Sequence, residues 1–373
     1  MNASLPTTGP SLAEILDRHT REASLVQPEG DRLRCLACGH RCLVGEGKRG
    51  ICKVRFVADG RLRAPFGYVA GLQCDPIEKK PFYHVYPGHD ALTFGHMGCD
   101  YHCDFCQNWV TSQALRDPAA QAPITLLGPE QVADMARREG ARLVVSSYNE
   151  PLITAEWAVA VFEHAAAAGL GCAFVSNGNA TPEVLDFLRP WLTAYKVDLK
   201  GFDDRRYRTL GGTLDRVLDT IKGLYARGVW LEVVTLIVPG FNDREEELRD
   251  AARFLASVSR DIPWHLTAFH PEYRLTDPGA TSTAQLVRAC EIGAEEGLRF
   301  VYAGNRPGQV GPWENTRCPS CGGTVIERSA FHLRGYALSA DGRCLHCFAP
   351  VPGVWASAPG VTSAARRPRL VRQ

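Results

Sequence analysis

Long apolar runs, excess charge and a leader-like amino terminus are all lacking in this chain. No apolar run approaches the roughly 18 residues that a membrane-spanning helix needs, so the sequence predicts none. The formal net charge is only +1, which argues against a protein whose main function is to bind nucleic-acid phosphates. Because the amino terminus has no basic segment followed by an apolar one, we expect a cytoplasmic protein.

Cysteine, in contrast, is abundant, with 14 residues in a chain of 373. In a cytoplasmic protein, cysteines at this density are more typical of metal ligands than of disulfides. All but three of them fall into three clusters. Cys74, Cys172 and Cys290 remain, and we expect them to pack as small apolar side chains, although Cys74 lies in an expected loop. The chain is long enough for a large α/β domain with one or two small modules.

The central cluster consists of Cys99, Cys103 and Cys106, at the spacing C-x3-C-x2-C. Thiolates are the usual ligands of iron–sulfur clusters, which normally take four of them. With only three thiolates, a four-iron cluster keeps one iron without a protein ligand, and such an iron can hold a substrate or cofactor. A zinc knuckle and three unrelated core cysteines are the alternative interpretations.

The two outer clusters each supply four cysteines, so neither leaves a coordination position open. The amino-terminal set has glycines around it that allow tight turns, and it suits zinc or a second iron–sulfur cluster; it consists of Cys35, Cys38, Cys42 and Cys52. The carboxyl-terminal set has two C-x2-C pairs about 20 residues apart, the pattern of a structural zinc ribbon. It consists of Cys318, Cys321, Cys344 and Cys347.

Strand-like and helix-like segments alternate from residue 91 onward, which predicts βα units and a parallel sheet. The expected strands are 92–96, 143–147, 172–176, 195–199, 231–238, 265–270 and 300–302. The expected helices are 129–139, 155–168, 182–188, 214–227, 245–257 and 282–296. Six or seven βα units indicate a partial or complete TIM-type (β/α) barrel, whose chemistry lies at the carboxyl ends of the strands.

The expected domain boundaries follow from these patterns. Residues 1–30 form an amino-terminal helix or arm, in which Ser11 caps a helix reaching about Leu25. Residues 31–90 are a cysteine-rich module with a lead-in loop, 91–310 the barrel, 311–355 a zinc-ribbon-like module and 356–373 a disordered tail. Within the lead-in loop, 71–84, two prolines and an E-K-K run disfavour a regular element. We expect 75–83 to lie against the cluster face of the barrel; a solvated charged surface is the alternative.

The C-x3-C-x2-C spacing, with Phe105 directly before the last cysteine, resembles the radical S-adenosylmethionine (SAM) superfamily. This resemblance implies a [4Fe–4S] cluster whose open iron chelates the methionine end of SAM. Reductive cleavage of SAM then gives a 5′-deoxyadenosyl radical. The resemblance also implies a reducing protein of the flavodoxin or ferredoxin type as a partner.

Polar residues follow four of the expected strands, and their convergence on one face predicts a binding site. Glu150 can take the ammonium of SAM, and Lys200 and His270 can engage its carboxylate or ribose oxygens. Ser176 and Asn177 can hydrogen-bond the carboxylate or the sugar. No catalytic residue is assigned. The full set of candidate cofactor-binding residues is Asn149, Glu150, Ser176, Asn177, Asp198, Lys200 and His270.

The order of these segments resembles the subgroup that includes the glycyl-radical-enzyme activators. Its G-G-E, D-L-K and F/Y-H segments correspond here to 148–150, 198–200 and 269–270. Activators of this kind commonly carry an acidic residue where Val175 stands in this chain. A carboxylate-based cation site beside SAM is therefore not implied.

Over residues 33–355 the chain is similar to a narrower family, the AmmeMemoRadiSam system radical SAM enzymes. The matching segments are C-x2-C-G-H-x-C, G-x-C-x-V-R, D-P-I-E-K-K-P, G-C-x3-C-x-F-C-Q-N-W and Y-N-E-P, followed by the terminal cysteine ribbon. That resemblance implies association with proteins of the AMMECR and Memo types.

Two classes of function are open at this point. The first is a radical SAM enzyme acting on an unidentified substrate, with a glycyl-radical-enzyme activase as a specific form of it. The second is a metal-stabilised RNA-binding or electron-transfer module. The near-neutral charge and the lack of an aromatic and basic stacking array argue against RNA binding, and an electron carrier needs no barrel with polar strand ends. The enzyme is favoured.

Overall fold

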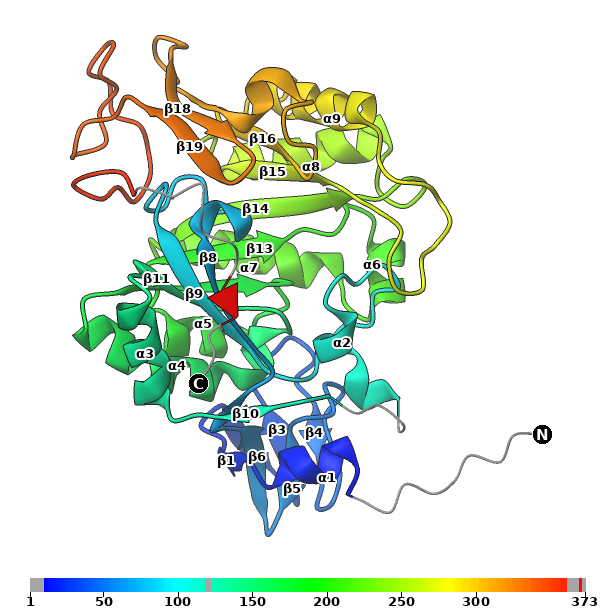
Figure 1. Cartoon of the computed structure of the whole chain (residues 1–373). Coiled ribbons are helices and arrows are strands. Elements are labelled where there is room, and N and C mark those ends of the chain that lie inside the picture. Colours follow the sequence, from blue (N-terminus) through cyan, green and yellow to red (C-terminus); the bar gives the residue numbers. More distant parts are fainter. Residues whose placement is uncertain (1–9, 118–121, 361–368, 371–373) are drawn as a thin grey trace.

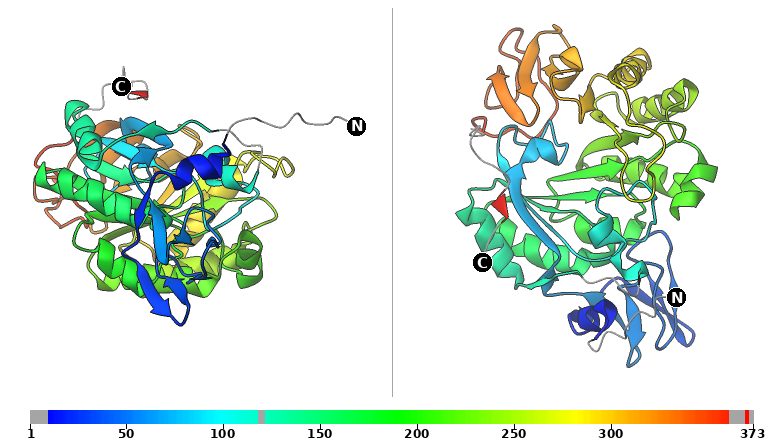
Figure 2. Two further views of the ribbon diagram at one scale, coloured as in Figure 1. Left: turned by 90° about the horizontal axis from the view of Figure 1, so that it is seen from below. Right: turned by 45° about the vertical axis from the view of Figure 1, so that its right-hand side comes forward.

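A computed structural model describes residues 10–117, 122–360 and the backbone of 369–370. Its centre is a nine-stranded sheet with two small modules at opposite ends (Figures 1 and 2). In spatial order the strands are β16 (Val301–Gly304), β15 (Trp264–Ala268), β14 (Trp230–Ile237), β13 (Ala194–Asp198), β12 (Gly171–Ser176), β11 (Leu143–Ser146), β9 (Asp90–Gly95), β8 (Gly71–Pro76) and β20 (Arg369–Leu370).

In this sheet β9 and the strands from β11 to β16 are parallel, and each of β11 to β16 pairs with the sheet strand that comes before it in the chain. Each new parallel strand is added on the same side of the previous one, from β9 to β16. Since every crossover between them is right-handed, all the helices lie on the same face of the sheet. The other face is left as the inside of a barrel. Within the described residues the sheet ends at β16 and β20, so the barrel is partial. The expected α/β fold is confirmed.

The crossover helices agree with the expected ones to within one or two residues. They are α3 (Pro129–Arg138), α4 (Ala155–Ala167), α5 (Pro182–Leu188), α7 (Leu214–Ala226), α8 (Glu245–Val258) and α9 (Thr283–Glu295). Local caps fix their starts: Thr181 accepts from the Val184 amide, and Ser282 forms a capping box with Gln285. None of the described helices is long and apolar enough to cross a membrane.

Several short elements complete this part of the chain and were not expected. Among them, α6 begins at a cap formed by Asp203 and ends at the left-handed Gly211. They are α2 (Trp109–Ser112), α6 (Asp204–Leu210), the pair β7 (Tyr68–Val69) and β10 (Thr125–Leu126), and the 3-10 helices η1 (Ile77–Lys79), η2 (Ala114–Arg116), η3 (Pro151–Thr154) and η4 (Gly311–Glu314).

The segment before the cluster strand differs from the expected loop. Residues 71–76 form β8, which pairs antiparallel with β9 along its whole length, and η1 follows. Pro76 is the last residue of the strand, where a missing amide is tolerated. Cys74 therefore lies buried in a strand, and the central sheet begins at 71 instead of 91.

The amino-terminal module carries two three-stranded sheets. The first contains β1 (Thr20–Glu22), β6 (Arg61–Pro65) and β5 (Phe56–Ala58); the second contains β2 (Val26–Glu29), β3 (Arg32–Cys35) and β4 (Leu43–Val44). Ser11 caps α1 (Leu12–Asp17) as expected, but the helix does not reach Leu25. It ends early because residues 20–22 pair with β6.

The carboxyl-terminal module is a three-stranded sheet of β17 (Thr316–Arg317), β18 (Thr324–Ser329) and β19 (His332–Tyr336). It packs at the end of the barrel near β16 (Figure 1). Beyond it, residues 369–370 pair with β8 as β20, so the expectation of a disordered tail does not hold there. Residues 356–360 of the expected tail are also described, and the Gly360 amide donates to the Pro87 carbonyl at 3.0 Å. Residues 361–368 and 371–373, like 1–9 at the other end of the chain, lie outside the described residues.

Candidate active site

The three central cysteines lie on the loop that joins β9 to α2, at the carboxyl end of the parallel strands. Cys103 is buried, and Cys99 and Cys106 are half-buried. The Tyr101 amide donates to the Cys99 sulfur at 3.3 Å, and the Ser112 hydroxyl lies 3.1 Å from the Cys106 sulfur. The loop therefore carries one buried and two half-buried cysteines within eight residues.

This loop, 96–108, is held by the amino-terminal module. Gly98 has φ +94°, and a Cβ on it would come within 2.8 Å of a Val54 methyl and 3.0 Å of the Cys52 carbonyl oxygen. The close approach of the two backbones needs glycine at this position. The cysteine-rich module thus lies directly against the residue that precedes Cys99.

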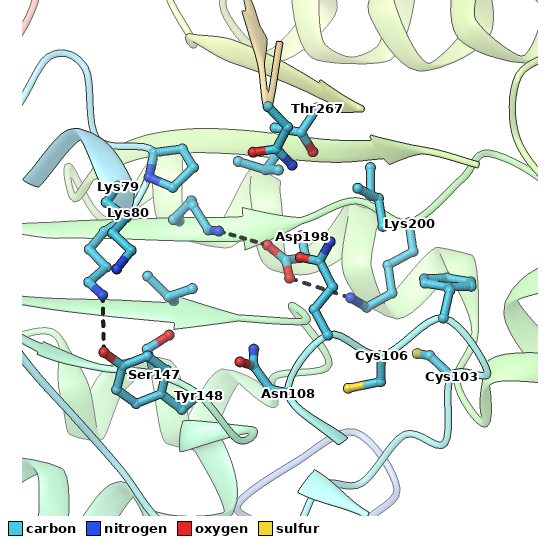
Figure 3. Close-up of a pocket in the computed structure, with 18 residues that line it drawn as sticks. Lys79, Lys80, Cys103, Cys106, Asn108, Ser147, Tyr148, Asp198, Lys200 and Thr267 are labelled. Atoms are coloured by element: carbon cyan, nitrogen blue, oxygen red, sulfur yellow. Dashed lines mark hydrogen bonds and ion pairs between the residues drawn. The ribbon is translucent and has the colours of Figure 1, made fainter. Parts of the chain in front are cut away.

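A cavity of about 380 Å³ opens in front of the loop (Figure 3). Its walls come from the cluster loop, from the ends of the strands β11 to β15 and from the segment after β8. Cys103 and Cys106 form one side, and Lys79 and Lys80 stand on the opposite side (Figure 3). The expectation that 75–83 packs against the cluster face is confirmed for these lysines.

An ion-paired group lines the cavity at the end of β13. Asp198 lies 3.0 Å from the Lys196 ammonium and 3.4 Å from the Lys200 ammonium. Although burial opposes ionisation, these two ammonium groups lower the pKa of Asp198. Asp198 is therefore a carboxylate with a cation on each side of it, and Lys200 lies on the side of Cys103 (Figure 3).

A buried polar network supports the cluster loop from behind. The Glu150 carboxylate accepts from the Ser176 hydroxyl and from the Asn177 amide, both at 2.7 Å. The Asn177 side chain in turn donates to Asp100 at 2.7 Å, and the Asn179 side chain donates to the second oxygen of Asp100 at 2.8 Å. Burial, helped by the nearby Asp100 charge, raises the pKa of Glu150 to about 8. The network ties the ends of β11 and β12 to the residue after Cys99.

Comparison with known proteins decides the family. The profile of the radical SAM superfamily matches residues 96–255, which include all three central cysteines. The uncharacterized protein MJ0808 of Methanocaldococcus jannaschii is 36% identical over 331 residues, covering 88% of this chain and 97% of that protein. The chain belongs to the radical SAM superfamily.

Other similar proteins share a smaller part of the chain. The isethionate sulfite-lyase activating enzyme of Oleidesulfovibrio alaskensis is 25% identical over 186 residues, covering 48% of this chain and 59% of that enzyme. Among solved structures, a domain of the pyruvate-formate lyase-activating enzyme from Bacteroides vulgatus gives a TM-score of 0.39 at 20% identity, covering 43% of this chain and 98% of that one. Streptococcus suis SuiB bound to S-adenosylmethionine gives 0.44 at 15% identity, covering 61% and 53%.

The candidate SAM-binding residues of this radical SAM protein fall into two groups. Asp198 and Lys200 line the cavity. Glu150, Ser176 and Asn177 are buried in the network behind the cluster loop and are not among the lining residues. Their assignment to SAM therefore stays a prediction.

Asn149 and His270 are also absent from the cavity wall. The Asn149 side chain accepts from the His96 amide at 3.0 Å. His270 has a side chain 58% exposed, with Glu272 at 3.7 Å. Both remain candidate SAM ligands by resemblance only.

Sequence reasoning missed several residues of the cavity wall. Lys196 stands two positions before Asp198 on β13, and Val175 lies on β12 next to it. Side chains two positions apart on a strand lie on the same face of the sheet. Once Asp198 is placed in the site, this alternation therefore predicts that Lys196 lies there too. Tyr148, Asn108 and Asn305 come from loops, for which no such period exists.

The carboxyl-terminal cysteines form a second candidate metal centre. The sulfur atoms of Cys318 and Cys347 are 3.6 Å apart, and those of Cys321 and Cys344 are 3.8 Å apart. All four lie within 4.8 Å of one another, the one such group of possible ligands in the described part of the chain. The amino-terminal set, 35–52, lies together in the module that contacts the cluster loop, with three of its four cysteines buried.

Proposed function

We propose that this protein is a radical SAM enzyme that cleaves SAM reductively and abstracts hydrogen from a substrate held in the cavity. The observation that carries the proposal is the loop with Cys99, Cys103 and Cys106. It lies at the carboxyl end of a partial barrel and borders a cavity of about 380 Å³. Three thiols from one loop, beside a space suited to a small molecule, fit a [4Fe–4S] cluster with one open iron. With SAM bound, such a cluster supplies a 5′-deoxyadenosyl radical.

The residues around the cysteines have positioning and shielding roles in this proposal. Asp198 and Lys200 present a carboxylate and an ammonium at the cavity wall, the groups that can pair with the charged ends of SAM. Phe105, Val234 and Leu236 give the wall apolar surface that limits water at the reaction centre. Glu150 and Asp100 fix the cluster loop through their hydrogen bonds. Direct contact of Glu150 with the SAM ammonium would require its present hydrogen bonds to change.

A glycyl-radical-enzyme activase is the second candidate function. The similarity to the isethionate sulfite-lyase activating enzyme supports it, although that match covers only 48% of this chain. The AmmeMemoRadiSam assignment is a competing and narrower proposal, and it brings proteins of the AMMECR and Memo types as partners. In either case we propose a flavodoxin- or ferredoxin-type protein as the electron donor.

The outer cysteine sets have structural roles in this proposal. Four thiolates around one zinc ion at about 2.3 Å stand about 3.8 Å apart, close to the separations in the carboxyl-terminal set. We therefore assign zinc to Cys318, Cys321, Cys344 and Cys347. For Cys35, Cys38, Cys42 and Cys52, zinc and a second iron–sulfur cluster both remain open.

Cluster reconstitution tests the proposed function. Anaerobically reconstituted, reduced protein should form 5′-deoxyadenosine from SAM, and SAM should change the EPR spectrum of the reduced cluster. Replacement of Cys99, Cys103 and Cys106 by alanine should abolish both signals. Cys290→Ala removes a core cysteine that lies in α9, outside the cavity wall, and should retain both. Cleavage of SAM by the triple variant would refute the assignment.

A further inference from the structure

The E-K-K segment of the sequence places two ammonium groups in the cavity wall, and a third comes from β13. Lys79 and Lys80 follow β8, and Lys196 lies on β13; all three line the cavity, opposite or beside the cluster cysteines (Figure 3). Resting on the proposed function, we propose that the substrate carries a carboxylate or phosphate group and that Lys79, Lys80 and Lys196 bind this group.

The geometry of Lys80 is that of a positioned, buried ammonium. Its side chain is only 7% exposed and lies 2.9 Å from Asp75, and its ammonium donates to the Tyr148 hydroxyl at 3.2 Å. The ammonium also lies 4.9 Å from the centre of the Tyr148 ring. Burial lowers the pKa of Lys80, and the neighbouring charges of Lys79 and Lys196 lower it further, so the three cations lie close enough to repel one another.

Lys79 is the accessible member of the group. Its side chain is 34% exposed, and its ammonium lies 2.8 Å from Asp75, whose own side chain is fully buried behind the two lysines. One carboxylate thus anchors two ammonium groups. Each of the two retains hydrogen-bond donors beyond the one given to Asp75, since a lysine ammonium has three.

The charge around Lys79 and Lys80 is unbalanced without an anionic ligand. Four lysines line the cavity, whereas Asp198 is the one carboxylate among the lining residues in the described part of the chain. Behind the wall stand Asp75 and, beside Lys196, Glu232, whose carboxylate already accepts from His265 at 2.6 Å. On the side of Lys200 the thiolates of the cluster loop add negative charge. At the opposite side the single Asp75 carboxylate faces the two ammonium groups of Lys79 and Lys80, which leaves a local positive excess in a part-buried site. Unpaired buried charge is costly, so the arrangement favours a ligand that brings negative charge.

The position of these lysines separates them from the expected SAM site. The family resemblance implies that the methionine end of SAM would bind at the cluster, and Cys103 and Cys106, which would hold that cluster, lie on one side of the cavity. Lys79 and Lys80 stand on the other side of the cavity (Figure 3). An anionic group bound there keeps the rest of the substrate between the lysines and the cluster.

Anion binding to the reconstituted, SAM-loaded full chain tests this inference without a turnover assay. We would measure binding of inorganic phosphate and of succinate separately, by equilibrium dialysis at low ionic strength. Wild-type protein should bind at least one of them saturably, and the tighter probe indicates whether phosphate or carboxylate is preferred. Lys79→Gln and Lys80→Gln should each weaken that binding at least tenfold. Lys48→Gln, at an exposed lysine of the amino-terminal module, is the matched control and should bind like wild type.

The outcomes separate this inference from the proposed function. Unchanged binding in both lysine variants, or no saturable binding of either probe by wild type, would overturn the lysine site. Lys79 is half-exposed, so its variant should fold even if replacement of the buried Lys80 does not, and circular dichroism checks both. Formation of 5′-deoxyadenosine is measured on the same wild-type preparation. Lysine-dependent anion binding without any SAM cleavage would sink the proposed function and leave the anion site standing.

Discussion

At the scale of single residues, the most unusual carboxyl group outside the active site is that of Glu78, directly before the two cavity lysines. It is 1% exposed, and one of its oxygens accepts from the Gly88 amide at 2.8 Å. Burial raises its pKa from 4.5 to about 7, against the opposing effect of Arg328. A carboxyl group that resists ionisation makes the folded state bind a proton more tightly than the unfolded state does.

We expect Glu78 to make the protein less stable as pH rises. Because its folded pKa exceeds the unfolded value, its stabilising contribution is complete below about pH 4.5 and is lost as pH rises through about 7. The difference corresponds to at most about 3 kcal/mol in the free energy of unfolding. Glu78→Gln should flatten this dependence, measured by urea unfolding between pH 5 and 8. Glu163→Gln, on the exposed face of α4, should keep the wild-type slope. Parallel curves for wild type and Glu78→Gln would contradict the prediction.

At the scale of elements, one buried ion pair joins the amino-terminal module to the barrel. The Arg55 guanidinium donates to both carboxylate oxygens of Glu156 on α4, at 2.7 and 2.8 Å, and both side chains are 1% exposed. Glu156 also accepts from the amides of Ser24 and Leu25 at 3.2 Å. Because the same module contacts Gly98, this pair holds the module against the cluster loop.

Removal of one member of this pair should destabilise the docking strongly. Glu156→Ala leaves the Arg55 charge buried without its partner, which typically costs about 3–5 kcal/mol in the free energy of unfolding. Denaturant unfolding should show this loss, and iron content after reconstitution should fall as the cluster loop loosens. The double variant Arg55→Met/Glu156→Leu should recover most of the stability, because no buried charge remains. If Glu156→Ala lowers the free energy of unfolding by less than about 1 kcal/mol, the ion pair does not hold the amino-terminal module against the barrel.

At the scale of the whole molecule, hydrogen bonds join the carboxyl-terminal module to the segment that carries the cavity lysines. The Arg328 guanidinium donates to the Tyr83 carbonyl at 2.7 Å. The His84 ring bridges the Pro352 carbonyl and the Tyr302 hydroxyl, each at 2.6 Å. Burial lowers the pKa of His84 to about 4, so this bridge is neutral at physiological pH. The ribbon thus packs behind the cavity and does not line it.

We expect loss of the ribbon metal to unfold the ribbon and to spare SAM cleavage. Cys344→Ala removes one of four ligands from a closed site, and in small modules of this kind metal binding and folding are coupled. Metal analysis should show the loss of one zinc per chain, and limited proteolysis should cut within 313–355. Formation of 5′-deoxyadenosine should persist, because the site has no open position for SAM. If the variant loses SAM cleavage while residues 313–355 stay protease-resistant, the module takes part in catalysis.

The sequence by itself determined the elements that follow from local pattern. Alternating apolar segments and end caps predict β9, the strands from β11 to β16 and the crossover helices, because period and capping act over a few residues. Cysteine spacing identifies the cluster loop and the ribbon for the same reason. The two cysteines of a C-x2-C pair are close in space in almost any fold, whereas the two pairs of the ribbon, at 318–321 and 344–347, meet only when the module folds.

Tertiary structure decided what depends on distant partners. Residues 71–76 become β8 because β9 supplies their hydrogen bonds, which outweigh the local loop preference of the segment. Glu150 faces the Ser176 and Asn177 donors instead of the cavity, since pairing of β11 with β12 brings those donors beside it. Lys196 joins Lys79 and Lys80 across more than a hundred residues only when the sheet forms. Long-range hydrogen bonds and burial set these positions, and no local pattern in the chain encodes them.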